Sequence, residues 1–226
     1  MVTTPSTREL KKADKRERIR LAALALFSEL GYEATTMRDV ARKAGVALGT
    51  LSLYAQDKRD LSLLVFNDRI GDLTTQAIAA AWRDRNADLL TRLMAFFSAY
   101  YSDFDRNHTL ARVFLQLNYY SSGMHGPAYH AMTLRVFGAV EAMVNEARGS
   151  GEIARDGEDS DLVARHFFFV FSSSVRWWIA AEKPSLMQGL DELSRLLAIQ
   201  IAGLKQPLSG PARKAGMANR RRNARD

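Results

Sequence analysis

Apolar side chains recur at helical spacing along most of this 226-residue chain. The clearest case lies between residues 19 and 30, where six apolar residues follow the order i, i+3, i+4, i+7, i+8 and i+11 on one helix face. They are Ile19, Ala22, Ala23, Leu26, Phe27 and Leu30. The chain has only 5 prolines, and no alternating strand pattern of useful length is present. The sequence therefore predicts an all-α fold of about nine helices.

Capping residues and glycines divide the chain into successive helices. Gly31 is placed as the left-handed residue that follows the first helix. Thr36 and Asp39 form an [ST]-x-x-[DE] capping box that opens a short second helix, and Asp57 is the expected N-cap of a fourth helix that runs towards Trp82. Further apolar repeats predict helices around residues 89–104, 110–117, 134–144, 160–181 and 186–204.

Positive charge is concentrated at the two ends of the chain. Residues 1–60 carry +4 (12 basic against 8 acidic side chains), residues 61–206 carry −2 (14 against 16) and residues 207–226 carry +5 (6 against 1), which gives the net +7. This asymmetry favours a polyanion such as nucleic acid as the partner of the ends, although a solubilising tail would look the same. We expect residues 1–12 to be a disordered basic arm and residues 207–226 a disordered basic tail.

Residues 36–54 have the layout of a helix-turn-helix. Ala41 and Ala44 are small where two helices must approach closely, and Gly45 permits the turn between them. Ala47 to Tyr54 is long enough for a two-turn third helix, which would lie in the major groove of DNA. Short helix pairs with an Ala-Gly turn also occur as plain structure, so the spacing alone leaves both interpretations open.

The stretch from Arg20 to Leu61 resembles the N-terminal domain of the tetracycline repressor (TetR) family, without a gap in the motif. The residues that carry the resemblance are Ala22-Ala23, Leu26-Phe27, Gly31-Tyr32, Thr35-Thr36, Val40-Ala41, Ala44-Gly45-Val46, Gly49-Thr50-Leu51, Tyr54, Lys58 and Leu61. The resemblance implies a DNA-binding transcriptional regulator. Its domains would be a helix-turn-helix at residues 13–60 and a helical effector-binding and dimerisation domain at residues 61–206.

The resemblance also implies roles for individual residues in binding a double-stranded DNA operator. Thr36, Tyr54 and Lys58 would contact phosphates, Lys58 beside the N-terminus of the fourth helix. The residues expected at base edges are Arg38, Leu48, Gly49, Thr50 and Ser52. Two positions depart from the family pattern, since Ser52 stands where an aromatic residue is usual and Ala55 where phenylalanine is usual. The base preference of relatives therefore does not carry over.

The larger domain is rich in neighbouring aromatic residues, which cannot all face one core because successive side chains on a helix point about 100° apart. From the family resemblance we expect a homodimer through the helices at 160–181 and 186–204, and a pocket for a small apolar or aromatic effector. The expected pocket residues are Trp82, Phe97, Tyr101, Phe114, Phe137 and Phe168, with Arg176, Arg135 or His166 as polar anchors. Aromatic residues at this spacing also serve as plain core.

The sequence gives no support for catalysis, a cofactor or a metal site. The chain has no cysteine, and its 4 histidines lack the i, i+4 spacing of an H-E-x-x-H motif. We find no secretion signal and no membrane span, and we expect a cytoplasmic protein.

Three functions remain in competition. The first is a repressor that an effector releases from its operator. The others are an effector-independent or architectural DNA-binding protein that relies on its basic tail, and a carrier or enzyme built on the helical domain.

Overall fold

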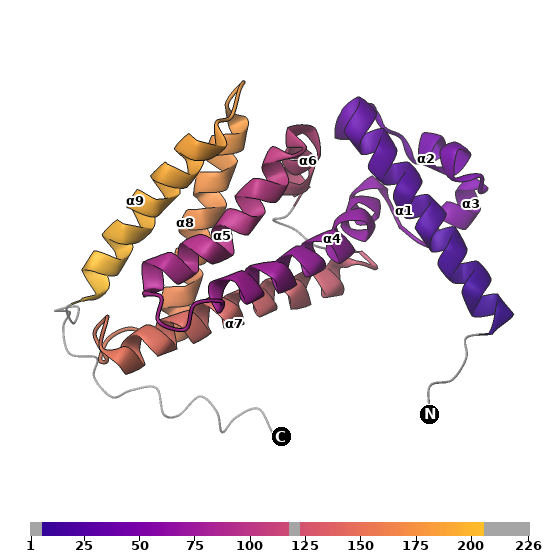
Figure 1. The fold of residues 1–226 in the computed structure, drawn as a ribbon. Helices are drawn as coiled ribbons and strands as arrows, with labels where there is room; N and C mark the ends of the chain where they lie inside the picture. Colours follow the sequence, from indigo (N-terminus) through magenta and orange to yellow (C-terminus); the bar gives the residue numbers. More distant parts are fainter. Residues whose placement is uncertain (1–5, 118–122, 206–226) are drawn as a thin grey trace, which may run out of the picture.

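The computed structural model describes residues 6–117 and 123–205, and this part of the chain folds into nine α-helices without a strand (Figure 1). The helices are α1 (Thr7–Ala34), α2 (Met37–Ala44), α3 (Leu48–Leu51), α4 (Lys58–Ala81), α5 (Leu89–Asp105), α6 (His108–Leu117), α7 (Gly126–Ser150), α8 (Ser160–Ala180) and α9 (Leu186–Leu204). The predicted fold class is confirmed, and the expected tail at 207–226 lies outside the described residues.

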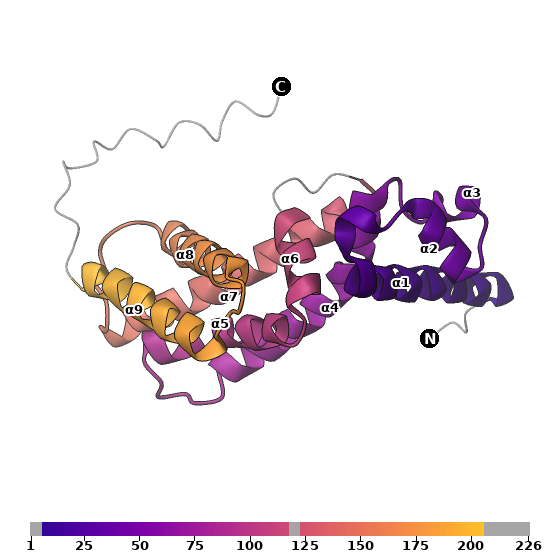
Figure 2. The same cartoon turned by 90° about the horizontal axis from the view of Figure 1, so that it is seen from above.

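The helices form an elongated molecule with α1–α3 at one end and α8 and α9 at the other (Figures 1 and 2). Helix α4 joins the two parts, because its first turns pack on α1 and its remaining length packs on α5 and α7. The domain boundary expected at residues 60 and 61 therefore falls inside α4, so one continuous helix connects the helix-turn-helix end to the larger domain.

Helix α1 starts earlier than the sequence analysis expected. A capping box opens it, in which Glu9 N donates to Ser6 Oγ and Ser6 N donates to the Glu9 carboxylate. Residues 7–12, expected to be a disordered arm, are thus helical, while residues 1–5 lie outside the described part. Gly31 interrupts the other end with φ +80°, as its predicted capping role requires.

The predicted caps of α2 and α4 are present, whereas α3 is shorter than expected. Asp39 N donates to Thr36 Oγ1 at 3.2 Å, Asp60 N donates to Asp57 Oδ1 at 2.7 Å, and Gly45 ends α2 in the left-handed conformation. The α-helical part of α3 covers only Leu48–Leu51, and turn hydrogen bonds carry the chain on to Ala55. No side chain caps this helix at Ala47, which is consistent with its short length.

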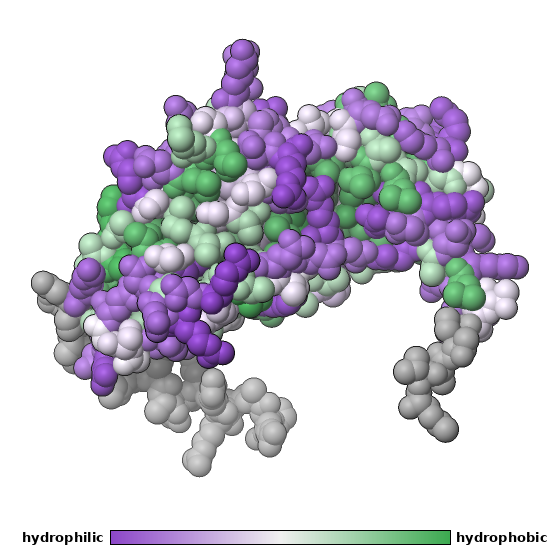
Figure 3. Space-filling model, viewed as in Figure 1, coloured by the Kyte–Doolittle hydropathy of each residue, from purple (hydrophilic) through white to green (hydrophobic). Residues whose placement is uncertain are grey.

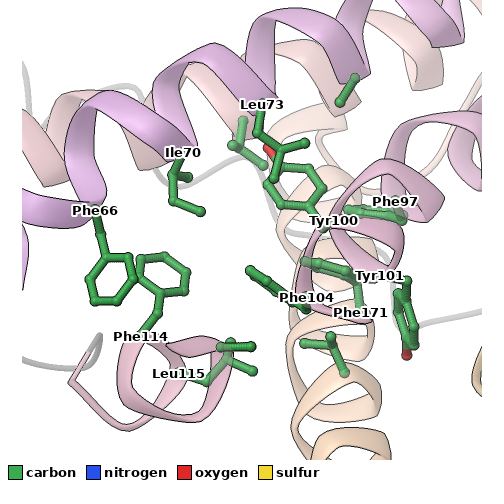
Figure 4. Packing of buried hydrophobic residues seen from close by; sticks show 14 of the residues in the cluster. Phe66, Ile70, Leu73, Phe97, Tyr100, Tyr101, Phe104, Phe114, Leu115 and Phe171 are labelled. Atoms are coloured by element: carbon green, nitrogen blue, oxygen red, sulfur yellow. The ribbon is translucent and has the colours of Figure 1, made fainter. Parts of the chain in front are cut away.

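The core of the larger domain is built from aromatic rings of α4, α5, α6 and α8, which point towards one another (Figure 4). Phe97 and Phe171 stack with centroids 4.4 Å apart, and Phe66 and Phe114 lie 5.0 Å apart. Offset and edge contacts of this kind add to the stability gained from burying the rings. Within the described residues, no helix is long and apolar enough to cross a membrane.

Candidate functional site

The helix-turn-helix exposes the side chains that were expected to read bases. Arg38 on α2 and Leu48, Gly49 and Ser52 at α3 are exposed, and Thr50 is half-buried. Beneath them Leu51 is fully buried and Val46 packs against the core, as predicted from the motif. The hydroxyl of Ser52 donates to Leu48 O at 3.2 Å, so a small side chain tied to its own helix occupies the position where an aromatic was usual.

The predicted phosphate contacts lie on the same part of the molecule, but Lys58 is already engaged. Its ammonium group donates to Tyr32 O at 2.8 Å and to Glu33 O at 3.3 Å, and it lies 4.2 Å from the Tyr32 ring centroid. Lys58 thus binds carbonyls at the C-terminal end of α1 and holds α4 against it. Thr36 is exposed, and Tyr54 is half-buried with its hydroxyl 3.4 Å from Lys12 O. Phosphate binding by these residues stays a prediction.

The larger domain contains a cavity of about 480 Å³ enclosed mainly by α4–α8. This volume lies within the range of small-molecule sites, which runs from roughly 300 to 1,000 Å³. Of the nine residues expected in an effector pocket, four line the cavity: Phe114, Phe137, Phe168 and Arg176. The structure therefore brings four of the nine predicted residues together around one cavity.

The other predicted pocket residues lie elsewhere because helix rotation points them into the core or towards other partners. Phe97 and Tyr101 are fully buried, and the Tyr101 hydroxyl lies 2.9 Å from Ser174 Oγ. Trp82 lies under the guanidinium of Arg92, 4.4 Å from ring centroid to Cζ. His166 is 3.1 Å from the side-chain amide of Gln200, and Arg135 donates to Thr75.

Several cavity residues were not predicted from the sequence. Tyr129, His130 and Thr133 on α7 and Ser172 and Ser173 on α8 add polar groups to the apolar wall. These α8 serines directly follow the aromatic run at 166–171 and lie on the same helix as Arg176, whose guanidinium donates to Ser172 O at 2.7 Å. A run of three serines close before an arginine, directly after an aromatic stretch, was the signal available in the sequence.

One wall of the cavity also includes Tyr100, which ends in a buried pair of hydroxyls. Its hydroxyl lies 2.8 Å from Thr74 Oγ1, and Thr74 in turn donates to Ile70 O. Burial raises the pKa of the Tyr100 phenol to about 12, although the hydrogen bond to Thr74 acts in the opposite direction. Tyr100 is thus a neutral group at physiological pH, and the wall that it forms carries no charge.

A hydrogen-bonded joint connects the cavity-bearing domain to the DNA-reading end. His125, directly before α7, has its Nε2 2.7 Å from Tyr54 O, and its backbone N donates to Asp60 Oδ1 at 2.9 Å. Asp60 is 1% exposed and also accepts from Gln56 N, while Asn67 donates to His125 O. We call these residues the His125 joint. No local sequence signal marks this joint, because its central pair is separated by 71 residues.

Large apolar side chains remain exposed on α8 and α9. On α8, Phe169 is 56% exposed and Trp177 is 75% exposed; on α9, Met187 is 78% exposed and Ile199 is 70% exposed. Scattered single apolar residues on a surface are common, but a concentration of this kind on two adjacent helices marks an interaction surface. Among the described residues, no group of three or more His, Cys, Asp or Glu side chains could hold a metal ion.

Comparisons with known proteins identify the N-terminal part. Residues 19–65 match the family model described as bacterial regulatory proteins of the TetR family. The fatty acid metabolism regulator protein of Bacillus subtilis is 26% identical over 186 residues, covering 81% of this chain and 92% of the relative.

Solved structures share the fold over most of the chain. The transcriptional regulator FadR from Bacillus subtilis in complex with stearoyl-CoA is 23% identical, with a TM-score of 0.64, covering 80% of this chain and 96% of that one. FadR from Thermus thermophilus in complex with lauroyl-CoA is 21% identical, also with a TM-score of 0.64, covering 87% and 98%. Residues 19–65 thus form a domain of the TetR type of bacterial regulatory proteins, and the described helices share the fold of the FadR structures.

Proposed function

We propose that this protein is a dimeric repressor that leaves its DNA operator when an apolar effector occupies the cavity. The observation that carries the proposal is that α7 lines the cavity and that His125, directly before it, contacts the helix-turn-helix end. Tyr129, His130 and Thr133 line the cavity, and His125, one turn before Tyr129, is hydrogen-bonded to the reading end. A ligand that displaces the first turns of α7 would therefore alter the joint directly.

We propose a long-chain acyl thioester such as an acyl-CoA as the effector. The cavity wall is dominated by aromatic and aliphatic side chains, which suit an alkyl chain. Arg176 and His130 stand at the same cavity and supply polar groups for the thioester end or for a nearby anionic group. Two FadR structures of the same fold hold stearoyl-CoA and lauroyl-CoA, which supports this ligand class here.

The release step follows from differential affinity for two states. In the effector-free protein the His125 joint fixes the reading end against α7, and this state binds DNA. In the effector-bound protein the joint opens, and the reading heads of the dimer lose their fit to the two half-sites. An effector shifts this equilibrium only by the difference in its affinity for the two states, so its effect on DNA binding equals the effect of DNA on its own binding.

The dimer that this requires would form through α8 and α9. Phe169, Trp177 and Met187 are exposed there, and pairing with a second copy would remove that apolar area from water. The two reading ends lie at the opposite end of the elongated molecule, which leaves them free to reach successive half-sites (Figure 1).

The proposal is tested with lauroyl-CoA and stearoyl-CoA against coenzyme A alone. An operator is first obtained by selection from random DNA. The acyl forms are expected to raise Tm and to release the operator, and coenzyme A alone is expected to do neither. A ligand present at 100 times its Kd adds about 2.7 kcal/mol to the free energy of unfolding. If no acyl form changes Tm or DNA binding, the acyl effector is refuted.

A matched pair of variants places the ligand in the cavity. Thr133→Trp fills the cavity from α7, whereas Leu134→Trp adds the same group at the next position, which is exposed and outside the cavity. Thr133→Trp is expected to bind operator without responding to lauroyl-CoA, and Leu134→Trp is expected to respond like wild type. Equal responses of the two would place the effector elsewhere.

The architectural alternative is tested by deleting residues 207–226. A repressor is expected to keep its sequence preference and lose only salt-sensitive affinity, while an architectural protein would lose most of its binding.

A further inference from the structure

The first two turns of α1 carry a stripe of basic side chains. Arg8, Lys11, Lys12 and Lys15 stand at i, i+3, i+4 and i+7, which places them within about 100° of the helix circumference. All four are exposed, and none forms an ion pair with any residue in the described part of the chain. We call these four residues the α1 stripe.

Acidic residues of the same turns lie outside the α1 stripe and are engaged with other groups. Asp14 pairs with Arg18, Glu17 pairs with Arg20, and Glu9 is used in the capping box. The cations and carboxylates are therefore segregated, whereas a helix face that is merely solvated commonly mixes the two signs. This separation leaves the α1 stripe with an uncompensated positive charge.

The α1 stripe continues the face of α1 that carries the helix-turn-helix. Ile19, Ala22 and Ala23 follow at i+11, i+14 and i+15 from Arg8, and all three are buried in the core that α1 shares with α2 and α4. The same face is apolar where the domain covers it and basic where α1 extends beyond that core. The change at residue 19 indicates that the exposed part faces a polyanion rather than more protein.

The α1 stripe lies beside the reading segment. The Tyr54 hydroxyl is 3.4 Å from Lys12 O, and Lys12 and Arg16 line one groove with Glu9, Leu53 and Tyr54. Both α3 and the N-terminal end of α1 lie at the end of the molecule opposite α8 and α9 (Figures 1 and 2). The space-filling view shows hydrophilic residues over much of this end, with white and green residues next to the grey N-terminal trace (Figure 3). A DNA duplex read by α3 would therefore pass close to the α1 stripe.

The helix holds the α1 stripe in a defined geometry. The capping box closes the first turn with bonds of 2.6 and 3.3 Å, and Leu10 N donates to Ser6 O at 3.0 Å. At 1.5 Å per residue, Arg8 and Lys15 are about 10 Å apart along the axis of α1.

We propose that the α1 stripe is a fixed part of the DNA interface, which binds backbone phosphates beside the bases that α3 reads. The inference rests on the proposed function as a DNA-binding regulator. Contacts of this kind supply affinity and orientation without reading sequence. The interface thus extends beyond the helix-turn-helix onto the first turns of α1. Residues 7–12 of these turns were expected from the sequence to be disordered.

The salt dependence of binding tests the proposal with the full chain. Lys11→Gln/Lys15→Gln removes two charges from the α1 stripe, and Lys183→Gln/Lys205→Gln removes two exposed charges from the other end of the molecule. Each lost phosphate contact lowers the slope of log K against log salt by about 0.9, so two contacts in each of two subunits lower it by about 3.6. The first variant is expected to show this change equally on selected and random DNA, and the control is expected to keep the wild-type slope.

A second pair of variants tests the helical geometry while keeping all four charges. Ala13→Pro breaks α1 between Lys12 and Lys15, two turns before the buried residues, and Ala13→Ser is its control. Far-UV circular dichroism and Tm check that only these turns are lost. Ala13→Pro is expected to weaken binding and lower the slope, and Ala13→Ser to match wild type. Wild-type binding by Ala13→Pro would overturn the fixed geometry.

The outcomes separate this inference from the proposed function. A wild-type slope in Lys11→Gln/Lys15→Gln overturns the α1 stripe as a phosphate site, even if lauroyl-CoA still releases the operator. Conversely, a wild-type protein that binds operator and is not released by any acyl-CoA contradicts the effector proposal. The slope measured for Lys11→Gln/Lys15→Gln then still decides whether the α1 stripe binds phosphates. A loss confined to the selected operator would also overturn the proposal, because phosphate contacts weaken binding to all sequences alike.

Discussion

Replacing His125 by alanine tests whether the His125 joint carries the effector response. The substitution removes the ring whose Nε2 lies 2.7 Å from Tyr54 O, and it leaves the backbone bond from His125 N to Asp60 in place. If the joint holds the DNA-binding state together, its loss moves the effector-free protein towards the released state. The change therefore affects the protein without effector and leaves the effector-bound protein as it was.

The size of the change in affinity follows from the loss of the hydrogen bond between His125 and Tyr54 O. Such a bond contributes about 0.5–1.5 kcal/mol net, and Tyr54 is only half-buried, so water can partly satisfy its carbonyl in the variant. A loss of about 1 kcal/mol corresponds to roughly a fivefold change in an equilibrium constant. Operator affinity is therefore expected to fall and lauroyl-CoA affinity without DNA to rise, and the two factors are expected to multiply to about five.

The assay measures operator Kd with and without lauroyl-CoA, and lauroyl-CoA Kd without DNA. His125→Gln serves as the conservative variant, because its amide can donate from the same side, and it is expected to restore part of the response. Gly123→Ala approaches the joint from another direction: its Cβ would lie 2.7 Å from Asp60 Oδ1 at a residue with φ +94°. It should change both affinities in the same sense as His125→Ala.

The reasoning is refuted if His125→Ala weakens operator binding equally with and without lauroyl-CoA. In that case the histidine would only support the reading end, and coupling would travel by another route. Unchanged operator and effector affinities would refute it as well.

Three further outcomes are expected. Gly189→Ala should destabilise the protein by about 1–3 kcal/mol, because the added Cβ would lie 2.6 Å from the Trp178 ring. Gly203→Ala on the same helix meets nothing within 4 Å and should be neutral or stabilising. Calorimetry of the two variants distinguishes these effects on stability. Burial raises the pKa of Tyr101 to about 12, so the stability that its neutral phenol contributes is fully present below pH 10 and is lost as pH rises from about 10 to 12. Tyr101→Phe should therefore make the free energy of unfolding less pH-dependent in that window. An unchanged pH profile would argue against burial as the cause of the raised pKa. Lys58→Ala should lower the unfolding free energy by about 1–2 kcal/mol, since two carbonyls of α1 lose its ammonium, and a variant as stable as wild type would contradict that structural role.

Local sequence signals located the elements with good accuracy. Gly31, Gly45 and Gly151 each have the positive φ that a helix-ending glycine provides, and Asp57 caps α4 as predicted. The start of α1 was wrong although a signal was present, because Ser6 and Glu9 satisfy the same capping-box pattern that was used at Thr36. The basic charge and polar composition of residues 7–12 favoured a disordered arm instead.

Site residues were predicted less well than helices, for a physical reason. Phe97 and Phe114 are both apolar residues at helical spacing, yet the first stacks inside the core and the second lines the cavity. The difference depends on how each helix is rotated about its axis when it packs on its neighbours. The apolar repeat within one helix does not determine that rotation. The same limit applies to Lys58, whose partners belong to α1.

The sequence by itself determined the all-helical fold and the order of the helix-turn-helix, because periodicity, caps and turn glycines act within a few residues of one another. The tertiary structure alone decided which aromatic residues surround the cavity and that His125 contacts Tyr54. It also decided that the basic face of α1 lies beside the reading segment. These relations join helices far apart in the chain, and only their packing brings the residues within reach of each other.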